Sequence, residues 1–370
     1  MEGKQKVALT FALYQNEALV RRETVTQDIV KVGKGAKSHL RVDDDLASRM
    51  HAVIEVADND YHVRIADWRS KNGTYIGRTR IAGNKEWHPV KEGDLLRVGS
   101  TFFMLRNEPS QVADAEVPSL IGVSRAIREL RARIARLAVE NVPVLLSGET
   151  GTGKEVVARA LHQLSKRSGE FIAINCAAIP ESLAESELFG HAERSFTGAH
   201  ARLGVFRRAH RGTLFLDEIG DMAQELQSKL LRVLEDRLVT PVGGDRPVPV
   251  DVRIIAATHH DLRADADAGS FRSDLHARLA HLQLDLPPLR ARREDILPLL
   301  LHAWAEAAEA LSAELVQELL HYDWPQNVRE VLSIAERLRI DGPSAVLQTL
   351  QRRRNASASV RVETEDAESS

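Results

Sequence analysis

The sequence predicts a multidomain molecule in which an all-β sandwich is followed by an α/β unit and then by a small helical subdomain. At 370 residues the chain is too long for one ordinary domain. Up to about Arg106, short runs rich in Val, Ile and Tyr are separated by Gly-containing turns, the pattern of an antiparallel sandwich. From Ser119, apolar strands alternate with helix-length segments, which implies a largely parallel sheet covered by helices.

The predicted boundaries follow these changes in texture. The sandwich covers residues 1–106, and residues 107–118 form a polar, acidic linker with two prolines. The α/β unit covers residues 119–286, and the helical subdomain covers residues 287–340. We expect residues 341–370 to be a disordered tail, because they are dominated by Arg, Ser, Glu and Asp.

Composition narrows the functional classes. With 43% hydrophobic and 28% charged residues the chain has the balance of a soluble globular protein. The net charge of -3 gives no whole-chain argument for binding nucleic acid or a membrane. No apolar run approaches the length of a membrane helix and the first residues lack signal-peptide features, so we expect a cytoplasmic protein with no membrane contact.

Five apolar runs are the candidate strands of the parallel sheet. Each is bounded by turn residues and separated from the next by a helix-length segment. They are Val142–Leu146, Phe171–Ile174, Thr213–Leu216, Val252–Ala257 and His281–Leu286.

A phosphate-binding loop follows the first of these strands and opens a helix. Its glycines let the backbone surround phosphate oxygens, the helix N-terminus offers unpaired N–H groups, and its lysine adds positive charge. Its last residue is a glutamate where Ser or Thr usually holds Mg²⁺, so the ion must depend more on other groups. The residues of this ATP site are Gly148, Glu149, Thr150, Gly151, Thr152, Gly153, Lys154 and Glu155.

Two carboxylates end the third strand, where the carboxyl edge of a parallel sheet meets its ligand. We expect Asp217 to help hold Mg²⁺ and Glu218 to polarise the water that attacks the γ-phosphate. Adjacent acids at a strand end are often only a solvated turn. Their combination with a phosphate-binding loop favours the catalytic interpretation.

From Ser119 to about Arg339 the sequence resembles the AAA+ ATPase domain of sigma-54-dependent transcription activators. The matching stretches are Gly148–Glu155, Asn175–Ala178, Glu185–His191, Phe196–Ala199, Gly212–Ile219, Asp251–Thr258, Phe271–Leu275, Leu286–Arg290 and Trp324–Pro325.

This resemblance assigns roles to single residues. It implies that Asn175 pairs with Glu218 and relays the nucleotide state, and that His259 stands at a second sensing position. Arg272 and Arg278 match arginine fingers that act on the γ-phosphate of a neighbouring subunit, which implies a homo-oligomeric ring, usually a hexamer. Arg329 matches the nucleotide-sensing arginine of the helical lid.

The resemblance also implies that Phe196, Thr197 and Gly198 form the loop tip that contacts sigma-54 RNA polymerase. The chain departs from the family pattern at four positions. Arg194 and Ser195 replace Gly and Ala at the base of this loop, His259 replaces an asparagine, and Gln326 replaces a glycine. These changes put the coupling to sigma-54 in question more than ATP binding.

Residues from about Val7 to Arg106 resemble the forkhead-associated (FHA) domain, a reader of phosphothreonine peptides. The matching stretches are Val32–Lys34, Ala47–His51, Asp67, Ser70–Thr74 and Glu92–Asp94. By motif position Lys34, Ser48 and Arg49 contact the phosphate with Lys71 beside them, and Asn72 holds the peptide backbone. Lys34 replaces the usual arginine and lacks its two-pronged geometry. An FHA fold used for ordinary protein contacts is the alternative.

After Ile340 the residues are too few and too polar for a three-helix DNA-binding unit, so we expect no sequence-specific DNA binding by this chain. The sequence thus predicts an ATP-hydrolysing regulator of sigma-54-dependent transcription controlled by phosphothreonine recognition. Two alternatives remain open. The chain is either a phospho-dependent interaction subunit that has lost its sigma-54 output, or an ATPase that remodels another protein complex, such as a secretion machine.

Overall fold

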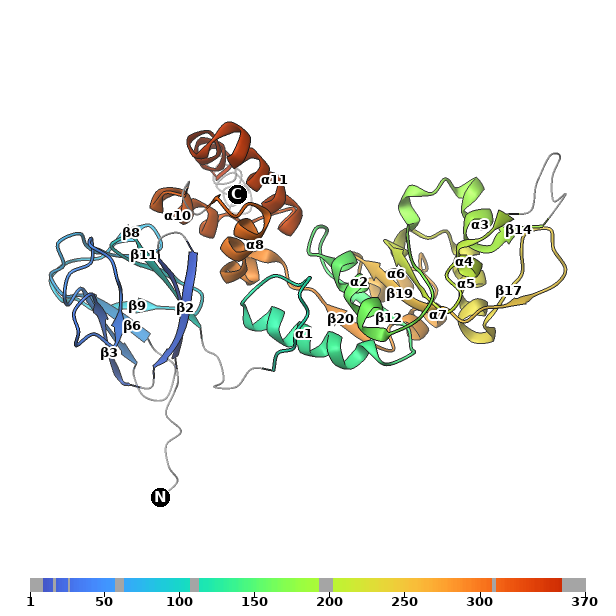
Figure 1. The fold of residues 1–370 in the computed structure, drawn as a ribbon, viewed down its shortest axis with the longest axis horizontal. Helices are drawn as coiled ribbons and strands as arrows, with labels where there is room; N and C mark the ends of the chain where they lie inside the picture. The colour runs from blue at the N-terminus through green and yellow to red at the C-terminus, as the bar shows by residue number, and fades with distance from the viewer. Residues whose placement is uncertain are drawn as a thin grey trace, which may run out of the picture.

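Residues 9–15, 18–25, 27–56, 63–106, 113–192, 202–307 and 311–354 are described by a computed structural model. The chain begins with a β-sandwich, continues as an α/β unit and ends in a group of helices, as the sequence predicts (Figure 1). Within the described residues no helix is both long and apolar enough to span a membrane.

The sandwich consists of a six-stranded and a five-stranded sheet. The first has the order β2-β1-β11-β10-β7-β8 and is antiparallel; the second has the order β4-β3-β5-β6-β9, with only β4 parallel to its neighbour. The strands are β1 (Leu9–Gln15), β2 (Ala18–Val25), β3 (Ile29–Gly33), β4 (Leu40–Arg41), β5 (Ala52–Val56), β6 (Val63–Asp67), β7 (Thr74–Ile76), β8 (Thr79–Arg80), β9 (His88–Val90), β10 (Leu95–Val98) and β11 (Thr101–Arg106).

The α/β unit is built on a parallel sheet of five strands in the order β13-β16-β19-β12-β20. They are β12 (Val144–Ser147), β13 (Phe171–Asn175), β16 (Thr213–Asp217), β19 (Arg253–Thr258) and β20 (Gln283–Asp285), each within one of the five predicted runs or ending at most one residue beyond it. Alternate residues of β16 point to opposite faces, so Leu214 and Leu216 join one core while Phe215 joins the other.

Helices cover both faces of this sheet. α1 (Arg125–Ala138) and α2 (Lys154–Ser165) pack on the Phe215 face. The opposite face is covered by α3 (Glu181–Phe189), α4 (Val205–Arg208), α5 (Gln224–Asp236), α6 (Leu262–Asp267) and α7 (Ser273–Leu279). Two short antiparallel pairs project from this layer: β14 (Gly190–His191) with β15 (Arg202–Leu203), and β17 (Leu238–Val239) with β18 (Val248–Pro249).

The lid, residues 289–354, contains α8 (Ile296–Ala303), α10 (Ala313–His321) and α11 (Asn327–Asp341) around the fully buried Trp324. It also corrects one expectation. Residues 343–354, predicted to belong to a disordered tail, are helical. Val346 and Leu350 lie four residues apart and are buried in the lid core, which stabilises this last helix.

The lid lies between the sandwich and the α/β unit (Figure 1). β2 of the sandwich runs beside α8. On the other side, the first turn of α11 contacts the phosphate-binding loop, where the backbone N–H of Val328 donates to the carbonyl of Gly151 at 2.9 Å. The lid therefore contacts both of the other parts of the chain.

Candidate functional site

The predicted phosphate-binding loop connects β12 to α2. Gly151 and Gly153 have φ angles of 80° and 107°, values that glycine adopts without a Cβ penalty. Lys154 is the first residue of α2 and only 7% exposed, and its Nζ donates to the carbonyl of Gly148 at 2.9 Å. The loop thus places a helix N-terminus and the ammonium group of a buried lysine side by side, an arrangement that suits an anionic phosphate.

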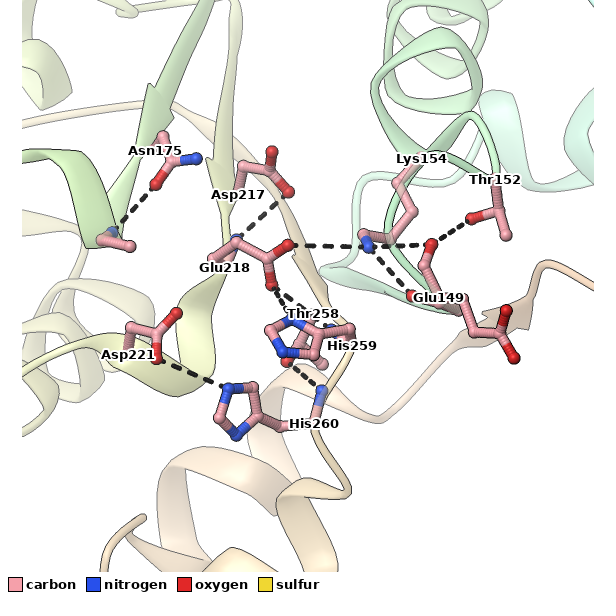
Figure 2. A network of polar contacts seen from close by, with 12 residues as sticks. Glu149, Thr152, Lys154, Asn175, Asp217, Glu218, Asp221, Thr258, His259 and His260 are labelled. Atoms are coloured by element: carbon pink, nitrogen blue, oxygen red, sulfur yellow. Dashed lines mark hydrogen bonds and ion pairs between the residues drawn. The ribbon is translucent and has the colours of Figure 1, made fainter. Parts of the chain in front are cut away.

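The catalytic candidates come from the adjacent strands β16 and β19. Asp217 ends β16, and Glu218 follows in a left-handed conformation with φ of 49°. Glu218 Oε1 lies 3.8 Å from Lys154 Nζ, and its Oε2 lies 2.7 Å from Nδ1 of His259, which follows β19 (Figure 2). Because β16, β19 and β12 are neighbours in the sheet, their carboxyl ends bring these three side chains together.

The two neighbouring carboxyl groups differ electrostatically. Burial and the charge of Glu218 raise the pKa of Asp217 above its ordinary value. Burial also disfavours the charged form of Glu218, but the hydrogen bond from His259 and the charge of Lys154 outweigh it and lower the pKa of Glu218. A second cation beside Asp217 would favour its ionised form.

Asn175 does not contact Glu218 in this structure. Its side-chain oxygen accepts from the backbone N–H groups of Ala177 and Ala178 at 2.9 and 3.2 Å and caps the short turn after β13 (Figure 2). The predicted partner of Asn175 is instead held by His259. Asn175 still lies next to Asp217, its register partner in β16.

Two lid residues that the sequence analysis did not single out hold the phosphate-binding loop. Asn327 is fully buried, and its Nδ2 donates to the Glu149 carboxylate at 3.1 Å and to the Thr150 carbonyl at 3.0 Å. Arg290 binds the same carboxylate with both Nη atoms, at 2.8 and 2.5 Å. Arg290 is the last residue of the matching stretch Leu286–Arg290, and Asn327 follows the matching stretch Trp324–Pro325 by two residues. The exposed Arg329 lies beside Gly151.

A mostly apolar cavity of about 260 Å³ lies next to the loop, between α2, the lid and the segment before α1. Its lining includes Leu120, Ile121, Val156, Leu286, Val328 and Leu332. The sequence analysis did not identify this cavity, because its walls are ordinary apolar side chains brought together from three parts of the chain. It has room for a flat ring system adjacent to the phosphate-binding loop.

The two predicted arginine fingers lie at opposite ends of α7 (Ser273–Leu279). Arg272 precedes α7 and forms an exposed ion pair with Asp274 at 2.7 Å. Arg278, near the end of α7, lines a cavity of about 220 Å³ together with Val142, Pro143 and Arg253, at the amino ends of β12 and β19. The phosphate-binding loop follows the carboxyl end of β12, so Arg278 lies at the opposite edge of the sheet.

The predicted phosphopeptide residues gather at one end of the sandwich. The backbone N–H of Lys71 donates to Ser48 Oγ at 3.2 Å, and the side chain of Asn72 donates to the Leu46 carbonyl at 2.7 Å. Lys34 Nζ lies 3.7 Å from the exposed Asp45 carboxylate, and Arg49 is exposed.

Buried His51 connects the loop of Ser48 to the loop of Gly73 through both of its ring nitrogens. Its Nδ1 accepts from the Ser48 N–H at 3.0 Å, and its Nε2 lies 3.0 Å from the Gly73 carbonyl. Burial lowers the pKa of His51, which favours the neutral imidazole that accepts from Ser48. The predicted sigma-54 loop, Phe196 to Gly198, lies outside the described residues together with Arg194 and Ser195.

Three family models match this chain. The sigma-54 interaction domain matches residues 120–285, the AAA+ ATPase lid domain matches residues 290–365, and the FHA domain matches residues 30–99. The lid match includes the helix of residues 343–354, in agreement with the correction above.

Similar proteins extend this comparison. The acetoin dehydrogenase operon transcriptional activator AcoR of Bacillus subtilis is 39% identical over 347 residues, which are 92% of this chain and 55% of AcoR. The C4-dicarboxylate transport transcriptional regulatory protein DctD of Pseudomonas aeruginosa is 51% identical over 231 residues, which are 60% of this chain and 50% of DctD.

A crystal structure of NtrX from Brucella abortus in complex with ATP is 37% identical, with a TM-score of 0.56, and covers 63% of this chain and 54% of NtrX. The chain spans about half the length of the curated relatives it matches. By its domains and relatives, the chain belongs to the family of sigma-54-dependent transcription activators, with an AAA+ unit, its lid and an FHA domain.

Proposed function

We propose that this protein binds ATP with Mg²⁺, hydrolyses it and uses the energy to remodel sigma-54 RNA polymerase in the cytoplasm, under the control of a phosphothreonine protein bound by the FHA domain. The observation that carries the proposal is the convergence of Lys154, Glu218 and His259 at the carboxyl edge of the sheet, beside a cavity that the lid lines on one side.

In this proposal the triphosphate lies on residues 148–155 and the adenine ring enters the 260 Å³ cavity. Lys154 binds the β- and γ-phosphates, and Arg329 reaches the nucleotide from the lid. Glu218 orients the attacking water and accepts its proton as the water oxygen bonds to the γ-phosphorus. The bond from that phosphorus to the bridging oxygen breaks, which releases ADP and phosphate. Asn175 and His259 respond to the presence of the γ-phosphate through their contacts near Asp217 and Glu218.

Asp217 fits a role in holding Mg²⁺, because it is partly buried and its pKa is raised by a neighbouring negative charge. Among the described residues no cluster of three or more His, Cys, Asp or Glu could hold a metal ion. The ion would therefore share Asp217 with phosphate oxygens, as Mg²⁺ commonly does, and would neutralise charge on the phosphates. Glu155, which stands where Ser or Thr usually holds Mg²⁺, forms an ion pair with Arg159 at 2.6 Å.

We propose a ring, hexameric as in the family, for the complete ATPase site. Arg278 lies at the opposite edge of the sheet from its own phosphate-binding loop, a position from which it can serve a neighbouring subunit. Arg272 lies at the other end of the same helix, as the N-cap of α7, and would serve the same neighbour. Residues Phe196 to Gly198, which lie in sequence between β14 and β15, would contact sigma-54.

A trapping experiment tests this function. Glu218→Gln keeps the shape of the side chain but removes the base, so it should retain ATP and accumulate the partner-bound state. Purified sigma-54 should be retained on the immobilised Glu218→Gln protein with ATP but not with ADP. Retention of a different complex with ATP, and none of sigma-54, would support the remodelling of another target and overturn this proposal.

The FHA half needs a separate test. Calorimetry with a phosphothreonine peptide library should show binding that disappears on dephosphorylation, and that weakens in Ser48→Ala, which removes the hydroxyl beside the Lys71 N–H. Equal binding of both peptide forms would leave the FHA domain as an ordinary protein-contact module.

A further inference from the structure

Strands β10 and β11 are buried on both faces. In β11, Phe103 and Leu105 point into the sandwich core, whereas Phe102 and Met104 belong to the same buried cluster as the lid side chains. Leu95 of β10 also belongs to the lid cluster, and these three residues are at most 5% exposed. A sheet face of this kind would be an exposed apolar patch without its cover. The lid is that cover.

Two bidentate ion pairs accompany this apolar contact. Arg78, in the turn between β7 and β8, donates from both Nη atoms to Glu318 of α10, each at 2.6 Å. Arg106, the last residue of β11, binds Glu294 with its Nε at 2.8 Å and with a second contact through Nη2. The side chains of Glu294 and Glu318 are only 3% and 7% exposed. Removing either arginine would take an ion-pair partner from a nearly buried carboxylate, which is costly, although Glu318 keeps Arg354 as a second partner.

Glu294 lies in a short segment, residues 292–295, that also forms hydrogen bonds to the phosphate-binding loop and to the start of α1. Nη2 of buried Arg292 donates to the carbonyl of Thr152 in the phosphate-binding loop at 3.0 Å. Asp295, fully buried, accepts from the N–H groups of Val123 and Ser124 at 2.6 and 2.7 Å and from Ser124 Oγ at 2.7 Å. Ser124 is the N-cap of α1.

We propose that segment 292–295 couples the FHA domain to nucleotide binding, with the Arg106–Glu294 contact as the connection from the sandwich. The same four residues contact β11, the phosphate-binding loop and the start of α1, so a shift of the segment changes all three contacts together. The inference rests on the proposed function, because it requires the loop to bind a nucleotide. The coupling is reciprocal. If nucleotide binding stabilises the contact between the sandwich and the lid, that contact raises the affinity for nucleotide by the same factor.

Amide hydrogen exchange on the full chain, with and without a non-hydrolysable ATP analogue and Mg²⁺, tests the coupling. In the wild type we expect slower exchange at residues 148–157 and also at residues 95–106. In Glu294→Gln and Arg106→Gln, at saturating analogue, the first change should remain and the second should disappear. Analogue affinity should fall about five-fold in both variants, and Arg106→Lys, which keeps the charge but not the two-pronged contact, should fall between these variants and the wild type.

Glu55→Gln is the matched control. Glu55 of β5 forms an ion pair with Arg64 of β6, and both strands belong to the sheet of the sandwich that does not include β10 and β11. It should behave as the wild type in both measurements. Slower exchange at residues 148–157 in the wild type without any change at residues 95–106 would overturn the coupling while leaving ATP binding intact. No change at residues 148–157 would overturn the proposed ATP site, and the coupling with it.

Discussion

At the scale of single residues, the motifs located the ATP site, but the contacts among its side chains depend on the folded geometry. As the sequence predicted, Lys154 opens the helix that follows β12, and Asp217 and Glu218 stand at the carboxyl end of β16. It could not show that Glu218 is held by His259 while Asn175 caps a turn, because both outcomes suit the same residue types. Asn327 follows the matching stretch Trp324–Pro325 by two residues, yet only the fold brings it to the loop, 178 residues away in sequence from Glu149.

Lys154 gives the most direct residue-level prediction. Lys154→Ala removes the one ammonium group that the structure places against Glu218 and the loop carbonyls. A charged hydrogen bond to phosphate contributes about 1.5–3 kcal/mol, so ATP affinity should fall by a factor of about 10 to 160. Titration with a fluorescent ATP analogue measures this. Lys229→Ala, at a surface ion pair with Glu185, should leave the affinity unchanged.

Asp67 gives a prediction about pH. It is buried, which alone would raise its pKa, but hydrogen bonds from Ser70 and Thr74 and the nearby His51 lower the pKa below its ordinary value of 3.8. A lowered pKa in the folded state means that the stabilisation is present above the unfolded pKa and is lost as the pH falls through the folded pKa.

Asp67→Asn should therefore reduce the free energy of unfolding of the sandwich by about 1–3 kcal/mol at neutral pH. The difference from the wild type should shrink as the pH falls below about 4. Urea unfolding across this pH range, followed by tryptophan fluorescence, provides the measurement. A difference that stays constant down to about pH 3 would show that the charge of Asp67 is not the stabilising element.

At the scale of elements, regular patterns predicted the strands well and missed the last helix. The five strands of the parallel sheet were visible because buried strands form continuous apolar runs. The helix of residues 343–354 was hidden because its cluster Arg352 to Arg354 looks solvated. In the structure Arg353 binds Glu330 and Arg354 binds Glu318, each at 2.6 Å, and these partners are distant in sequence.

Leu350 tests whether this helix is part of the lid. Leu350→Ala removes a side chain that is 2% exposed, and the loss should lower the free energy of unfolding of the lid by about 2–5 kcal/mol. Arg352→Ala, at an exposed position of the same helix, should change it by less than about 0.5 kcal/mol. Equal effects in thermal unfolding would indicate that the helix does not pack on the lid.

Gly151 tests the contact between the lid and the phosphate-binding loop. A Cβ at Gly151 would lie 2.1 Å from the carbonyl oxygen of Gln326, whereas a Cβ at Gly153 would meet nothing within 4 Å. Both glycines have positive φ, so the backbone strain is shared and the difference reports the clash. Without nucleotide, Gly151→Ala should lower the melting temperature more than Gly153→Ala. The reverse order would contradict the contact.

At the scale of the whole molecule, the family comparisons identify the domains, and the structure shows how they meet. The run Phe102 to Leu105 is apolar throughout, whereas a strand with one solvated face should alternate apolar and polar residues. This run was a sequence signal of the sandwich–lid contact. In the two ion pairs of this contact, Arg106–Glu294 and Arg78–Glu318, the partners are 188 and 240 residues apart, beyond the range of any local pattern. The sequence therefore predicted the sandwich and the helical subdomain as separate units, but not the hydrophobic core that they share.

Promoter opening by sigma-54 RNA polymerase tests the central claim most directly. With the wild-type protein and ATP, permanganate footprinting of a sigma-54-dependent promoter should detect unpaired bases at the start site. Glu218→Gln with ATP, and the wild type with ADP, should leave the promoter closed. A promoter that stays closed with the wild-type protein and ATP, while ATP is being hydrolysed, would contradict the claim that this ATPase remodels sigma-54 polymerase.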